Sequence, residues 1–66
     1  MKAIFSFKDP HLGSVHIVLP KVREVSKGLG SVVITFDNGE KRNIEHKQPE
    51  ELIKEIVTAI DAFYAR

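Results

Sequence analysis

The sequence predicts an α+β fold, an antiparallel meander of four to five strands followed by one C-terminal amphipathic helix packed on the sheet. Two observations support this class. Before His46, apolar and polar residues mostly alternate, as they do in half-buried strands. After Gln48, apolar residues recur at intervals of three and four, as on one face of a helix. The connections are short, so we expect consecutive strands to be neighbours in the sheet.

Three strands are predicted before the central hairpin. Residues 2–8 alternate with their aromatic side chains on one face, and residues 15–19 alternate until Pro20, which ends a strand or confines it to a sheet edge. After Pro20 the spacing changes, because Val22 and Val25 are three positions apart. A bulge or a tight turn within the third strand would account for that offset.

The strongest turn signal, Asp37-Asn38-Gly39, separates the two strands of the central hairpin. A two-residue turn would pair Val33 with Ile44. A three-residue loop, with Gly39 in the left-handed region, would pair Val32 with Ile44 instead. We expect the three-residue loop because it gathers the apolar residues on one face of the sheet.

A helix is predicted from Pro49 to within a residue or two of Arg66. Proline suits the first helical position, and Glu50 and Glu51 complement the positive end of the helix dipole. Glu50 can also reach Lys54 one turn later. The residues that form the apolar stripe of this helix are Leu52, Ile53, Ile56, Val57, Ile60, Phe63 and Tyr64.

Length and composition indicate a single small domain, residues 1–66, near the lower limit for a chain that folds without disulfides or metals. The chain has no cysteine, which leaves neither a disulfide framework nor a thiolate metal site. A net charge of +1 gives no global reason to expect nucleic acid or a membrane surface. Without a long apolar run or a signal peptide, we expect a cytoplasmic protein of bacterial or phage type, with no membrane association.

Few residues are candidates for catalysis or metal binding. Asp9 and the histidines at 11, 16 and 46 are metal-binding residue types, but the pattern does not bring them together, and surface histidines are the better interpretation. No nucleophile stands beside a base in a known motif. We therefore expect no catalytic residues, no metal, no cofactor and no enzymatic activity. A small metal-dependent enzyme is the third hypothesis.

Basic residues are frequent in the predicted third strand and in the returning arm of the hairpin. On one sheet, they would form a local stripe for phosphates. Glu24, Glu40 and Glu45 are interleaved among them, which is typical of a solvated sheet face, and no exposed aromatic residue is available for stacking on bases. Nucleic-acid binding is therefore the second hypothesis, and its candidate contacts are Lys21, Arg23, Lys27, Lys41 and Arg42.

The second half of the chain resembles known small proteins. Val33–Lys41, followed by Pro49–Ile56, is similar to small flagellar proteins of the FlbD type and to the last strands and helix of bacterial pleckstrin-homology-like domains. The opening pattern of FlbD-type proteins, a strand with an Asn-Gly turn, is absent, because the first strand ends in Asp9-Pro10. The order of strands and helix also resembles Whirly-type single-stranded DNA-binding proteins. These resemblances imply topology rather than function.

The main hypothesis is a non-enzymatic interaction or regulatory module that acts through protein–protein contacts, with another protein or a second copy of itself, as a homodimer. Four or five strands at ~4.8 Å spacing are roughly 19–24 Å wide, whereas one helix is ~10–12 Å across. The helix would leave apolar surface uncovered, unless the sheet curls around it. The candidate self-association residues are the apolar ones on the opposite sheet face, Ile4, Val18 and Val33.

Overall fold

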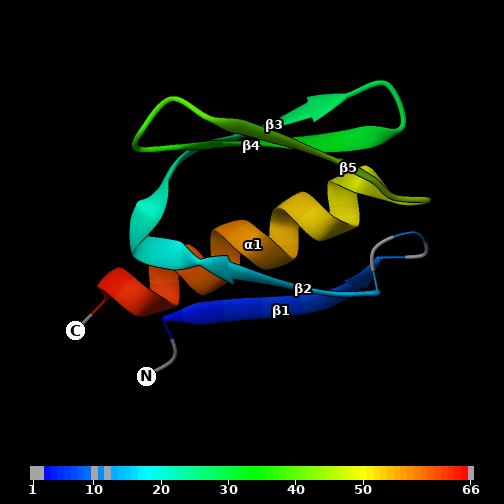
Figure 1. The fold of residues 1–66 in the computed structure, drawn as a ribbon. Helices are drawn as coiled ribbons and strands as arrows, with labels where there is room; N and C mark the ends of the chain where they lie inside the picture. Colours follow the sequence, from blue (N-terminus) through cyan, green and yellow to red (C-terminus); the bar gives the residue numbers. More distant parts are fainter. Residues whose placement is uncertain (1–2, 10, 12, 66) are drawn as a thin grey trace.

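Five antiparallel strands in two sheets and one C-terminal helix make up the fold, which confirms the predicted α+β class (Figure 1). The structure, a computed structural model, describes residues 3–9, 11 and 13–65. Lys2, Pro10 and Arg66, on which parts of the predictions fall, lie outside the described residues. The elements follow one another as β1 (Ile4–Asp9), β2 (Gly13–Val18), the 3-10 turn η1 (Leu19–Lys21), β3 (Val22–Gly28), β4 (Ser31–Phe36), β5 (Lys41–Glu45) and α1 (Pro49–Tyr64).

The strands do not form the single continuous meander that we expected. β1 and β2 form a two-stranded unit, here called the β1–β2 ribbon, while β3, β4 and β5 form a separate three-stranded sheet. Pro20 lies in η1 between them, and proline has no N–H to donate to a ladder. The chain therefore leaves the ribbon at Leu19–Lys21 and begins a second sheet. In Figure 1, α1 lies between the ribbon and the three-stranded sheet.

One hydrophobic core joins both sheets to the helix. Because the five strands are divided between two sheets, the comparison of one wide sheet with one narrow helix does not apply to this fold. The buried residues of the core cluster are Val15, Ile17, Val32, Ile34, Ile44, Leu52 and Ile56.

The change of spacing after Pro20 corresponds to a β-bulge. The register between β3 and β4 shifts between Val22 and Glu24, so Arg23 has no partner of its own in β4. The Asp37 N–H still donates to the Lys21 carbonyl oxygen at 2.8 Å, which holds the start of β3 beside the end of β4. Of the two predicted causes, a bulge or a tight turn, the structure has the bulge.

The central hairpin has the predicted three-residue loop. Val32 pairs with Ile44, and the Phe36 N–H donates to the Glu40 carbonyl oxygen at 2.8 Å, which closes the loop. Gly39 has a φ of +88°, in the left-handed region. This register turns Val32 and Ile44 into the core together.

We expect Gly39→Ala to lower the free energy of unfolding by about 1 kcal/mol, because a Cβ atom meets the carbonyl group in left-handed backbone. No other atom lies within 4 Å of that Cβ position, so backbone strain is the whole cause. Chemical denaturation measures the change, with Lys41→Ala as the control at an exposed position with ordinary φ. Equal stability of Gly39→Ala and the native protein would contradict the left-handed loop.

The helix α1 begins at Pro49, as predicted, and ends at Tyr64, within two residues of Arg66. Of its apolar stripe, Leu52 and Ile56 are buried in the core. Val57 and Tyr64, at the margin of the stripe, are exposed. Burial therefore follows the centre of the predicted stripe.

Candidate functional site

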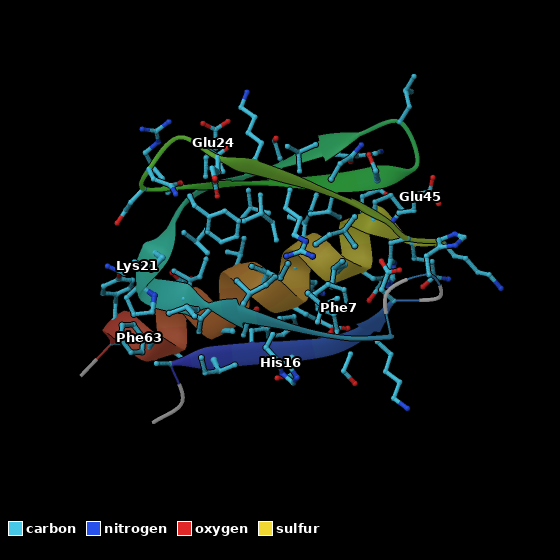
Figure 2. The ribbon with its side chains drawn as sticks, in the orientation of Figure 1. Phe7, His16, Lys21, Glu24, Glu45 and Phe63 are labelled. Atoms are coloured by element: carbon cyan, nitrogen blue, oxygen red, sulfur yellow. The ribbon has the colours of Figure 1, made fainter. Side chains whose placement is uncertain are left out.

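The outer face of the β1–β2 ribbon exposes two neighbouring apolar side chains. Ile4 and Val18 are partners in the ribbon register, and each is 42% exposed. The next pair along the same face is Ser6 and His16, whose Oγ and Nδ1 atoms are hydrogen-bonded at 2.8 Å. Figure 2 shows His16 pointing away from the body of the molecule. Two of the three predicted self-association residues therefore lie side by side.

The third predicted self-association residue, Val33, lies elsewhere. It belongs to β4, the central strand of the three-stranded sheet, where it pairs with Ser26 on one side and Asn43 on the other. It is half-buried. The structure therefore brings Ile4 and Val18 together but does not bring Val33 to them.

The inner face of β1 is incompletely covered. Val15 and Ile17 on β2 are buried, whereas their partners on β1, Phe7 and Phe5, are only half-buried. The ring centroids of Phe5 and Phe7 are 6.1 Å apart. The core therefore covers the inward side chains of β2 better than those of β1. Apolar surface is thus uncovered on this face of the ribbon as well.

An open groove of about 490 Å³ separates β1 from α1. One wall is Phe5, and the other is a flank of the helix on which Ala59 and Ala62 are the small members. Small side chains leave the Phe5 ring accessible from the side. We call this feature the β1–α1 groove, and its lining residues are Phe5, Glu51, Lys54, Glu55, Thr58, Ala59 and Ala62.

The five predicted nucleic-acid contacts are spread around the three-stranded sheet. β3 and β5 are its two edges, with β4 between them. Lys41 and Arg42 are consecutive in β5 and so point to opposite faces. Arg23 lies in the bulge, Lys21 belongs to η1, and Lys27 is paired with an acidic side chain. The structure does not gather these residues into one phosphate-binding stripe, and nucleic-acid binding stays a prediction.

The partner of Lys27 is Glu50 in the first turn of α1. The Lys27 ammonium donates to Oε2 of Glu50 at 2.9 Å, which ties β3 to the start of the helix. This hydrogen bond, together with the positive charge of Lys27, holds the pKa of Glu50 below its usual value. Both side chains are solvent-exposed, so water screens the pair. The ion pair therefore runs between elements, whereas the sequence suggested Lys54, within the helix, as the partner of Glu50.

The histidines are dispersed. His11 Nε2 lies 3.2 Å from Oε1 of Glu45, and this contact connects the end of the ribbon to β5. The backbone N–H of His11 donates to Oδ1 of the buried Asp9. His46 Nδ1 accepts a hydrogen bond from the Gln48 N–H. Within residues 3–9, 11 and 13–65, no group of three or more potential ligand side chains is placed to hold a metal ion.

Sequence reasoning missed the β1–α1 groove. Phe5 and Phe7 alternate with Ser6 and its neighbours, which predicts a strand with one face toward the core. The alternation does not reveal how much of that face the helix covers. No local pattern could have revealed the groove, because it depends on where α1 lies relative to β1 in the folded chain.

No known protein family, curated protein or solved structure matches this chain. The likenesses to FlbD-type, pleckstrin-homology-like and Whirly-type proteins therefore stay resemblances. In the part of the chain that the structure describes, no helix is both long enough and apolar enough to cross a membrane. The fold and the surface define a small α+β protein whose β1–β2 ribbon exposes apolar side chains.

Proposed function

We propose that this protein is a small non-enzymatic interaction module that acts through protein–protein contacts and associates with a second copy of itself. One observation carries the proposal, namely that the β1–β2 ribbon has uncovered apolar side chains on both faces. Ile4 and Val18 are exposed on the outer face, and Phe5 lines the groove on the inner face. Burial of such surface against a partner is the main driving force of protein association.

The small size of the chain adds to this argument. A domain of 66 residues buries a smaller fraction of its surface than a larger domain does. A partner that binds only the folded chain stabilises it by mass action. Self-association would therefore supply apolar burial that the single chain does not achieve.

Light scattering coupled to size-exclusion chromatography tests the proposal. Loading concentrations from about 1 to about 500 µM span the dissociation constants of weak dimers. Over this range, the mass should rise from the 7.4 kDa of one chain toward twice that value. Ile4→Lys should weaken association, because it places a charge in the apolar pair. Leu29→Lys, in the fully exposed loop between β3 and β4, is the matched control and should not. A constant monomer mass at every concentration would contradict the proposal.

A further inference from the structure

The direction in which each β1 residue makes its backbone hydrogen bonds follows from the ribbon register. The Leu19 N–H donates to the Ala3 carbonyl oxygen at 2.8 Å, so the backbone groups of Ala3 face β2. Along an antiparallel strand, successive residues direct these groups alternately to one neighbour and to the other side. The residues whose N–H and C=O groups face away from β2, toward the free edge of the ribbon, are therefore Ile4, Ser6 and Lys8.

We propose that this free edge pairs with the same edge of a second copy, antiparallel and centred on Ser6. The inference rests on the self-association proposed above and specifies its geometry. A ladder can form only between residues whose backbone groups face outward. If the pairing is centred on Ser6, all three outward-facing residues form backbone hydrogen bonds across the interface, because Ser6 lies opposite the partner's Ser6 and Ile4 lies opposite the partner's Lys8. Centring on Phe5 or Phe7 would engage only two in each copy.

The same register also covers the inner face. It places Phe5 opposite the partner's Phe7, and cross-strand aromatic pairs stabilise sheets. The two-fold axis stands perpendicular to the resulting four-stranded sheet, so both helices lie on the same side of it. The β1–α1 grooves of the two copies then face one another. Ala59 and Ala62 provide the small side chains that allow two helices to approach closely.

Other edges of the two sheets are less suited to pairing. The bulge at Arg23 disrupts the edge of β3, and Lys41 and Arg42 place charges at the start of β5. β1 runs for 6 residues, from Ile4 to Asp9, in unbroken register with β2. β2 is the other edge of the ribbon (Figure 1), and its inward side chains are buried in the core, whereas those of β1 are only half-buried. β1 is therefore the strand most open to a second copy.

Cysteine cross-linking tests the register, because the chain has no cysteine of its own. In the proposed dimer, the Cα atoms of the two Ser6 positions are about 5.5 Å apart, within the span of a disulfide. His16→Cys is the matched control, because it lies on the same face and also removes the Ser6–His16 hydrogen bond. The two positions 16 would be three strand spacings apart, about 14 Å, which no disulfide spans.

Each variant is oxidised mildly under native conditions and followed on a non-reducing gel. Ser6→Cys should form a covalent dimer at least about tenfold faster than His16→Cys. Equal rates, or no cross-link at position 6 while the native protein has a dimeric mass, would overturn the register and leave the proposed self-association standing. A native mass that stays monomeric at all concentrations would overturn both.

Discussion

Replacing Ile56 with alanine is expected to remove about half of the stability of this protein. The side chain is 0% exposed and belongs to the core cluster that joins α1 to both sheets. Loss of a buried isoleucine to alanine typically costs about 2–5 kcal/mol, through lost apolar burial and the cavity that remains. Domains hold about 0.05–0.15 kcal/mol per residue, so a chain of this length has roughly 3–10 kcal/mol in total. At the middle of these two ranges, Ile56→Ala removes about half of the stability of the protein.

The neighbouring Val57 provides the control. It is 43% exposed on the same helix, and Val57→Ala should change the free energy of unfolding by less than about 1 kcal/mol, since alanine also has the higher helix propensity. Urea denaturation of both variants at one protein concentration makes the comparison, because association would shift the midpoints with concentration. Similar losses in the two variants would mean that α1 packs through a different face.

Ile34→Asp is expected to unfold the chain outright. Ile34 is fully buried on the central strand of the three-stranded sheet, where its partners are Val25 and Arg42. An aspartate there must either keep a charge in an apolar core or take up a proton, and because its cross-strand neighbour Arg42 is solvent-exposed, burial of that charge still costs several kcal/mol. That penalty is comparable with the whole stability of a domain of this size.

Val33→Asp is the matched control for this second variant, because Val33 is adjacent in the chain and lies on the opposite, outer face of β4. The free energy of unfolding of this variant should fall by about 1 kcal/mol, which is the full range of measured strand propensities, and the variant should remain folded. Far-ultraviolet circular dichroism and the dispersion of amide proton resonances distinguish the two outcomes. A folded Ile34→Asp, or an unfolded Val33→Asp, would mean that β4 is shifted by one residue.

The elements themselves were predictable because they depend on local patterns. The Asp37-Asn38-Gly39 loop favours one register, and Pro49 with two glutamates behind it marks a helix start. The division into two sheets was not predictable with the same certainty. Pro20 is compatible both with an edge strand and with a strand end, and only the packing of β2 and β3 on opposite sides of α1 decides between them.

The candidate surface was predictable only in part. Ile4 and Val18 were identified from their position on the polar face, and their pairing follows from the ribbon register. Val33 satisfied the same pattern, but it belongs to another sheet, because alternation identifies a face and says nothing about which sheet carries it. The β1–α1 groove depends on where α1 lies relative to β1, a tertiary property that no local pattern contains.

The break at Pro20 also bears on how the chain folds. In the described part of the chain, every ladder joins two strands that are consecutive in the sequence, and the break at Pro20 divides these ladders into two separate sheets. Each hairpin therefore closes only a short loop, and the entropy lost in closing a loop grows with its length. Topologies built from local contacts reach the native state faster than those that pair distant strands. Because an isolated two-stranded hairpin is at best marginally stable in water, the β1–β2 ribbon depends on the core that it shares with α1 and the three-stranded sheet.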